Sequence, residues 1–147
     1  MKASMCVLFA VACWLVARAE EPQNILMLNR VRHYVDKLKG MVNNTNFINS
    51  PITGEIKECC IKSALECFRS KVLFLNGSNI KKSQTIINSD LRKPAITKTV
   101  SICSQKEIQE AQCKSCDSYP KVDSRTFMQN FQTLLQKIFV RLLVSQA

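Results

Sequence analysis

Apolar residues recur at steps of three and four in several stretches of the chain, and this spacing predicts amphipathic helices. Residues 23–42 form the first stretch, and its apolar stripe is Leu28, Val31, Val35, Leu38 and Val42. Residues 58–75 form the second, with a stripe of Ile61, Leu65, Phe68, Val72 and Leu75. The strongest pattern covers residues 124–145, with the apolar set Phe127, Phe131, Leu134, Leu135, Ile138, Leu142 and Leu143.

A fourth helix is predicted over residues 80–91, although the β-branched run Thr85-Ile86-Ile87 would also suit a strand. Pro94 ends this element in either case. Residues 43–56 are expected to form a loop. Residues 94–122 form a long connection, in which residues 105–112 can make a helical turn. Asp123 or Ser124 can cap the last helix.

The lengths of the three connections predict how the four helices are arranged. The short connection near Gly77 makes the second and third helices antiparallel. A connection of about 15 residues can stretch to ~50 Å, whereas an 18-residue helix is only ~27 Å long. The first two helices can therefore run parallel, as can the last two. We expect an all-α fold, a four-helix up-up-down-down bundle with two long crossover loops.

The composition and the N-terminal segment predict a single, secreted domain. The chain has 147 residues, of which 46% are hydrophobic and 22% charged, a balance that suits a single domain and excludes disorder. Lys2, the apolar run at residues 5–16 and Ala17-Arg18-Ala19 together resemble a signal peptide. The run is too short to span a bilayer. We predict a signal peptide at residues 1–19 and a secreted domain at residues 20–147, without membrane insertion. Loss of Lys2 and Arg18 lowers the net charge from +10 to +8.

Six cysteines remain after the signal peptide, namely Cys59, Cys60, Cys67, Cys103, Cys113 and Cys116. An even number in an oxidising compartment predicts three disulfides. Cys60 and Cys67 lie ~10.5 Å apart along a helix, and Cys113 and Cys116 lie ~10 Å apart in an extended segment. Two bonds can therefore form side by side, either Cys60–Cys113 with Cys67–Cys116 or the crossed pairs. Cys59 and Cys103 remain for each other, because a bond between adjacent cysteines is strained.

Catalytic and metal-binding uses of these residues are disfavoured. Cys113-Lys114-Ser115-Cys116 has the spacing of a redox pair, but no βαβ pattern surrounds it. A zinc site at Cys59, Cys60, Cys113 and Cys116 would need thiolates that secretion disfavours. His33 is the single histidine, so no nucleophile has a second histidine to serve it. We expect neither an enzyme nor a cofactor or metal.

Several motifs appear in the order found in the interleukin-2/interleukin-15/interleukin-21 cytokine family. Cys60 and Cys67, seven residues apart, precede the C-x-x-C and a final amphipathic helix. The matching segments are Val35-Asp36, Leu38-Lys39, Ile86-Ile87-Asn88, Arg92-Lys93-Pro94, Cys113-Lys114-Ser115-Cys116-Asp117-Ser118-Tyr119 and Leu134-Leu135-Gln136-Lys137, with Phe127 and Phe131. The chain resembles this family over nearly all of its secreted part, most densely over residues 113–138.

This resemblance implies a monomeric cytokine that brings a private receptor chain and the common gamma chain together on immune cells. It also implies the uncrossed bonds Cys60–Cys113 and Cys67–Cys116. By position, Asp36, Arg92 and Lys93 would contact the private receptor chain. Gln136 would face the common gamma chain, and so would Phe139, although the family has a smaller aliphatic residue there. Cys59 and Cys103 have no counterpart in the family's pattern.

The sequence also allows other functional hypotheses. An interleukin-15-like or interleukin-2-like cytokine is one alternative. A cationic host-defence protein that binds anionic membranes or polysaccharide is another, from a different class. Lys81-Lys82 and Arg92-Lys93 can bind sulfated polysaccharide, but no aromatic residues are interleaved with these charges, which disfavours nucleic acid. Asn43 and Asn76 begin N-glycosylation sequons in predicted loops.

Overall fold

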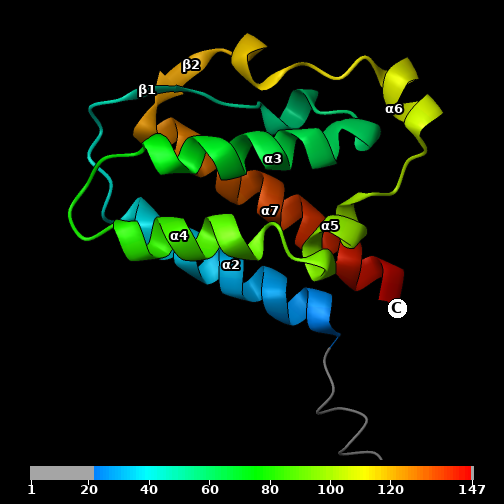
Figure 1. Cartoon of the computed structure of the whole chain (residues 1–147), viewed down its shortest axis with the longest axis horizontal. Helices are drawn as coiled ribbons and strands as arrows, with labels where there is room; N and C mark the ends of the chain where they lie inside the picture. The colour runs from blue at the N-terminus through cyan, green and yellow to red at the C-terminus, as the bar shows by residue number, and fades with distance from the viewer. Residues whose placement is uncertain (1–21, 147) are drawn as a thin grey trace, which may run out of the picture.

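The computed structural model describes residues 22–146, and most of this part of the chain is helical (Figure 1). Its helices are α2 (Gln23–Lys39), α3 (Ile61–Lys71), α4 (Lys81–Asp90), α5 (Pro94–Val100), α6 (Gln105–Ala111) and α7 (Ser124–Gln146). Two short strands, β1 (Phe47–Asn49) and β2 (Lys121–Asp123), pair in antiparallel fashion. The predicted signal peptide, with Cys6 and Cys13, lies outside the described residues.

The four predicted helices are present, with ends that differ from the prediction. α2 ends at Lys39, three residues early, and Gly40 follows as its C-cap. α3 is shorter than predicted, because the 3-10 turns Glu58–Cys60 and Val72–Phe74 take up its two ends. α4 forms despite its β-branched residues, so the strand alternative for this segment is wrong. Asp123 accepts a hydrogen bond from Thr126 N–H at 2.8 Å and so caps α7 as expected.

α5 is the helix that the pattern did not predict. Pro94 was expected only to end the preceding helix, but it occupies the first turn of α5. Proline is well suited to that position, because its missing N–H would have no partner there. Ile96 and Val100 then bury the inner face of this short helix.

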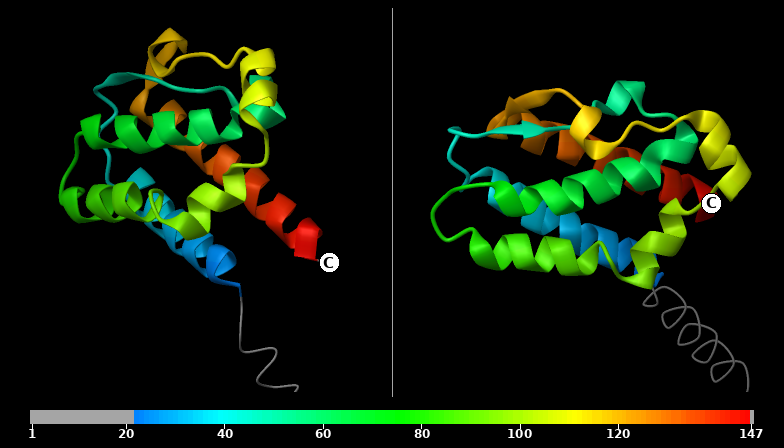
Figure 2. Two further views of the ribbon diagram at one scale, coloured as in Figure 1. Left: turned by 45° about the vertical axis from the view of Figure 1, so that its right-hand side comes forward. Right: turned by 45° about the horizontal axis from the view of Figure 1, so that its top comes forward.

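α2 lies between α4 and α7 and also contacts α5 (Figures 1 and 2). Its predicted stripe is buried as far as Leu38. Three phenylalanines form the centre of the core: Phe68 of α3 stacks on Phe131 of α7 with ring centroids 4.8 Å apart, and its edge meets Phe127 at 5.3 Å. All three are fully buried, so the core joins elements that are far apart in the sequence.

The connections that follow α2 and α3 meet at one end of the molecule. Val42 pairs with Gly77 in an isolated bridge, and Asn43 N–H donates to the Asn76 carbonyl at 2.8 Å. The start of α7 lies at the same end, because Asn44 Oδ1 accepts from Arg125 N–H at 3.0 Å. The last turns of α2 and α3 and the first turns of α4 and α7 are therefore grouped together (Figure 2).

The strand pair joins the two long connections. Phe47, Ile48 and Asn49 lie opposite Asp123, Val122 and Lys121. Ile48 is buried, whereas Phe47 is exposed. Both segments were expected to be irregular, because three residues are too few to show the alternation that predicts a strand.

Candidate functional site

The six described cysteines form three disulfides, the number that the sequence predicted. Cys60 bonds Cys113, Cys67 bonds Cys116 and Cys59 bonds Cys103, with Cα–Cα distances of 5.4, 5.2 and 5.5 Å. The uncrossed order is therefore the observed one. Cys113 and Cys116 bond different partners, so the C-x-x-C is not a redox pair in this structure. No thiolate among these six is left to bind zinc.

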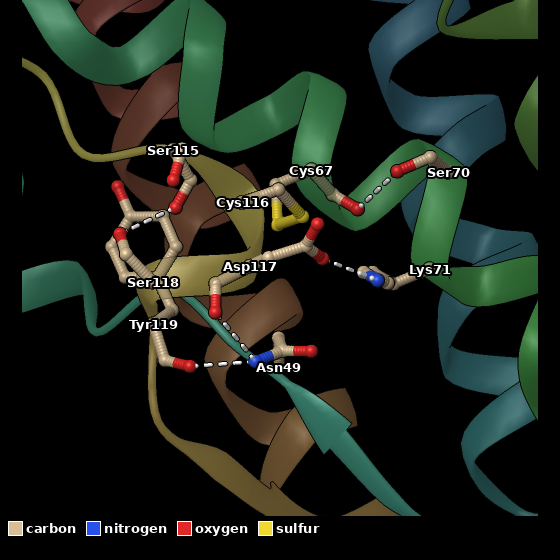
Figure 3. A network of polar contacts seen from close by, with 9 residues as sticks. All are labelled: Asn49, Cys67, Ser70, Lys71, Ser115, Cys116, Asp117, Ser118 and Tyr119. Atoms are coloured by element: carbon tan, nitrogen blue, oxygen red, sulfur yellow. Dashed lines mark hydrogen bonds and ion pairs between the residues drawn. A yellow bond between two sulfur atoms is a disulfide. The ribbon is translucent and has the colours of Figure 1, made fainter.

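The disulfide-linked connection covers the outer side of α3 (Figure 3). Lys71 Nζ of α3 lies 3.0 Å from Asp117 Oδ1, next to the Cys67–Cys116 bond. Asn49 of β1 donates to the carbonyls of Asp117 and Tyr119, at 3.3 and 2.7 Å. Residues 116–118 form a 3-10 turn, and Ser115 just before it has an extended backbone. The chain itself therefore occupies the side of α3 next to the Cys67–Cys116 bond.

Side chains of α2 and α7 meet along a surface that we call the α2–α7 surface. It consists of the polar residues Arg32, Asp36, Gln132 and Gln136, with Phe139 at its edge. Gln132 Nε2 donates to Asp36 Oδ1 at 2.6 Å, and Lys39 Nζ donates to Gln132 Oε1 at 3.0 Å. The Arg32 guanidinium donates to Gln136 Oε1. Several of these side chains line a shallow depression of about 410 Å³.

Phe139 is partly buried at the edge of this surface and packs against the core. The guanidinium carbon of Arg32 lies 4.4 Å from the centre of its ring, a cation–π contact. The ring is therefore neither a free surface anchor nor a fully buried core residue.

A second surface forms where α2 meets the end of α4. We call it the α2–α4 surface: Arg30, Asp90, Arg92 and Lys93. The side chain of Asp90 is only 2% exposed, yet it lies 3.0 Å from Arg30 Nε and 3.1 Å from Lys93 Nζ. Asp90 Oδ2 has no hydrogen bond of good geometry, so its contact with Arg30 is an ion pair without a hydrogen bond. Arg92 is exposed beside this buried carboxylate.

The two surfaces lie on opposite sides of α2. Arg30 and Arg32 are two residues apart, which separates them by about 200° around the helix axis. Arg30 accordingly contacts α4, while Arg32 contacts α7. One helix thus contributes charged side chains to two separate surfaces.

The structure divides the predicted receptor-binding residues between these surfaces. Arg92 and Lys93 lie together at the end of α4. Asp36 lies apart from them, on the same side of α2 as Gln136 and Phe139. It accepts a hydrogen bond there from Gln132. Gln132 and Asp90 were not predicted from the sequence. Gln132 could have been found from the sequence, because it lies one helical turn before Gln136, beside the apolar stripe of α7. No sequence pattern indicated Asp90, because its partner Arg30 is 60 residues away.

The two sequons are neighbours in space. Asn43 and Asn76 are exposed, and their backbones are joined by the 2.8 Å hydrogen bond beside the Val42–Gly77 bridge. The close approach requires glycine at position 77, because a Cβ there would lie 2.3 Å from the Met41 carbonyl oxygen. Glycans attached to the two asparagines would therefore be neighbours on the surface.

The basic pairs expected to bind polysaccharide are separated in space. Lys81 and Lys82 open α4, whereas Arg92 and Lys93 follow its end. Ten helical residues extend over about 15 Å, so these charges do not form one compact cluster. Between residues 22 and 146, no helix has both the length and the apolar character needed to cross a bilayer. No known family model matches the chain.

Proposed function

We propose that the chain is a secreted cytokine that resembles interleukin-21 and signals by bringing a private receptor chain and the common gamma chain together. The observation that carries this proposal is the position of α2 between α4 and α7, with charged side chains on two opposite sides. A protein that bridges two receptor chains needs two such surfaces, far enough apart for both partners to bind at once.

The grouping of helix ends supports an up-up-down-down bundle. In that topology α2 and α3 run one way and α4 and α7 run the other way, joined by two long crossovers. The bridge at Val42 and Gly77 and the contact of Asn44 with Arg125 fit this arrangement. The three disulfides fit folding in an oxidising compartment, which supports secretion.

Each surface is assigned one receptor chain. The α2–α4 surface binds the private receptor chain through Arg92 and Lys93. The α2–α7 surface binds the common gamma chain through Gln136 and the edge of Phe139. We assign Asp36 to this second surface, although the family resemblance places it with the private receptor, because it is hydrogen-bonded to Gln132 of α7.

Charge changes on each surface test the assignment. Arg92→Glu and Gln136→Lys alter exposed side chains, and both variants should remain folded by circular dichroism. Arg92→Glu should weaken binding to cells that carry only the private chain by about tenfold or more, while binding to the common gamma chain is kept. Gln136→Lys should do the reverse, and both should lose signalling. Lys98→Glu, an exposed change on α5, is the matched control.

Unchanged binding and signalling in both surface variants would contradict the bridging mechanism. A shift of binding to interleukin-15 or interleukin-2 receptor chains would instead support the alternative member of the family. Cells with defined receptor chains separate these outcomes.

Sulfated polysaccharide is a second candidate ligand, favoured by the net charge of +8 expected for the secreted domain and by the exposed Lys81 and Lys82. Attraction between exposed charges is screened strongly as salt rises, whereas a packed receptor interface is screened less. Elution from immobilised heparin near physiological salt, with intact receptor binding at the same salt, would favour the receptor as the functional partner.

A further inference from the structure

An aromatic groove lies at the end of the molecule where α2 and α3 finish, away from both proposed receptor surfaces. Phe47 is 72% exposed and Phe74 is 64% exposed, although both are large apolar side chains. They line a depression of about 440 Å³ together with Thr45, Asn46, Asn49, Lys71 and Lys121. Exposed aromatic rings with a polar rim are typical of a surface that something covers.

Asn46 connects this groove to a sequon. Its Nδ2 donates to the Phe74 carbonyl at 2.9 Å, and its Oδ1 accepts from Asn76 Nδ2 at 3.1 Å. Asn76 Nδ2 is the atom to which N-glycosylation attaches a sugar. The attachment atom thus contacts a residue that lines the groove, and Asn76 itself follows Phe74 by only two residues.

We infer that the groove is covered by an N-linked glycan on Asn76, whose first N-acetylglucosamine packs on Phe74 and Phe47. This inference rests on the proposed secretion of the chain. The donor is a lipid-diphosphate-linked oligosaccharide: a bond forms between Asn76 Nδ2 and C1 of the sugar, the bond from C1 to phosphate breaks, and the lipid diphosphate and one amide proton leave. The remaining N–H can still donate to Asn46.

The chemistry of the groove suits a sugar. One face of the N-acetylglucosamine ring presents C–H groups, which remove apolar surface of an aromatic ring from water when they pack on it. The rim offers hydrogen-bonding partners for the hydroxyls at Thr45, Asn46 and Asn49. Lys71 Nζ lies over the Phe74 ring, 5.4 Å from its centre, so the sugar would pack beside this ammonium group.

The neighbouring sequon provides a matched control. Asn43 is exposed and lies across the backbone from Asn76, but its side chain makes no hydrogen bond to the residues lining the groove within the described part of the chain. A glycan there starts from the same end of the molecule without the link through Asn46.

Protein secreted by mammalian cells tests the inference. Peptide mass spectrometry should find Asn76 occupied. Trimming with an endoglycosidase that leaves one N-acetylglucosamine should keep the melting temperature, whereas Asn76→Gln should lower it by roughly 2–4 °C. In a Phe74→Ala background, Asn76→Gln should cause little further loss. Asn43→Gln should leave the melting temperature of the Asn76-glycosylated protein nearly unchanged.

Three results would overturn the inference: an unoccupied Asn76 in the secreted protein, equal melting temperatures with and without the Asn76 sugar, or an equal glycan effect in the Phe74→Ala background. Receptor signalling by the secreted Asn76→Gln variant separates this failure from failure of the proposed function. Signalling that persists while the glycan effect is absent overturns only the inference. Loss of receptor binding in Phe74→Ala, with its glycan effect unchanged, would assign the groove to a protein partner and also overturn it.

Discussion

Arg30 of α2 lies 3.0 Å from the carboxylate of Asp90 on α4, and the two side chains differ sharply in exposure, at 51% and 2%. Lys93 lies 3.1 Å from the other oxygen of the same carboxylate. Two partly exposed cations thus compensate one buried anion. A partner that draws Lys93 away from Asp90 leaves the carboxylate to Arg30 alone, which couples binding at this surface to the packing of α2 on α4.

Removing both cations tests this arrangement. The double variant Arg30→Ala with Lys93→Ala leaves a buried charge without compensation, and we expect it to lower the free energy of unfolding by about 3 kcal/mol. Adding Asp90→Asn removes the buried charge and should restore a large part of that loss. Urea unfolding followed by circular dichroism measures both changes. Lys98→Ala is the control, and a triple variant no more stable than the double variant would contradict the role of Asp90.

The disulfide pattern predicts two separate clusters in a non-reduced tryptic digest. Trypsin cleaves after Lys114, between Cys113 and Cys116, so the bonds to Cys60 and Cys67 can be told apart. We expect peptides 58–62, 99–106 and 107–114 in one cluster, because Cys59 and Cys60 are adjacent, and peptides 63–69 and 115–121 in the other. Mass spectrometry reads both directly. Exchange of 107–114 and 115–121 between the clusters would show the crossed pairing.

Gly77 is predicted to be intolerant of even one added methyl group. A Cβ at this position would lie 2.3 Å from the Met41 carbonyl oxygen and 2.9 Å from Ile80 Cγ2, so the bridge to Val42 would have to open. We expect Gly77→Ala to lower the free energy of unfolding by about 2–3 kcal/mol. Gly54→Ala is the matched control, since no heavy atom lies within 4 Å of the Cβ it would add. Equal stability of the two variants would show that the bridge contributes little.

Acid should weaken the cap of α7. Hydrogen bonding from Thr126 lowers the pKa of Asp123 below its ordinary value of 3.8. Because the pKa in the folded state is the lower one, this contribution is fully present above about pH 4 and is lost as the pH falls through the folded value. Hydrogen bonds from Ser104 lower the pKa of Glu107 in the same sense.

Urea unfolding between pH 5 and pH 2 measures this effect. Asp123→Asn keeps a capping oxygen but no titrating charge, so its unfolding free energy should fall less steeply with acid than that of the natural chain. Glu110→Gln serves as the control, because the exposed side chain of Glu110 makes no hydrogen bond among residues 22–146. Identical pH profiles for Asp123→Asn and the natural chain would contradict the role of Asp123.

The long helices were predictable because each buries one face, so apolar residues recur in the sequence at the spacing of a helical turn. The stripe of α7 lies almost entirely in the core, and so does that of α2 up to Leu38. α5 and the strand pair were not predictable, because seven and three residues are too few to establish a period. Spacing indicated that Cys60 and Cys67 could bond two cysteines of one segment, but only the folded chain decides the direction of that segment.

The candidate surfaces depend on contacts that no local pattern reveals. Arg32 and Gln136 are 104 residues apart, and each is an ordinary polar helical residue when taken alone. The sequence resemblance selected Gln136, but Arg32 could be identified as its partner only once α2 and α7 were placed side by side. The same holds for the aromatic groove, since Phe47 and Phe74 lie in different connections.

The order of synthesis gives the disulfide pattern a further consequence. Cys59, Cys60 and Cys67 each precede their partners by 44 to 53 residues, which corresponds to about 2–10 s of translation at ~5–20 residues per second. In a chain secreted as proposed, three thiols would therefore reach the oxidising lumen before any of their native partners. Any bridge formed in that interval is a wrong one, and thiol–disulfide exchange must undo it before the native set can form. The yield of active protein in a cell is then expected to follow its isomerase supply more closely than its rate of synthesis.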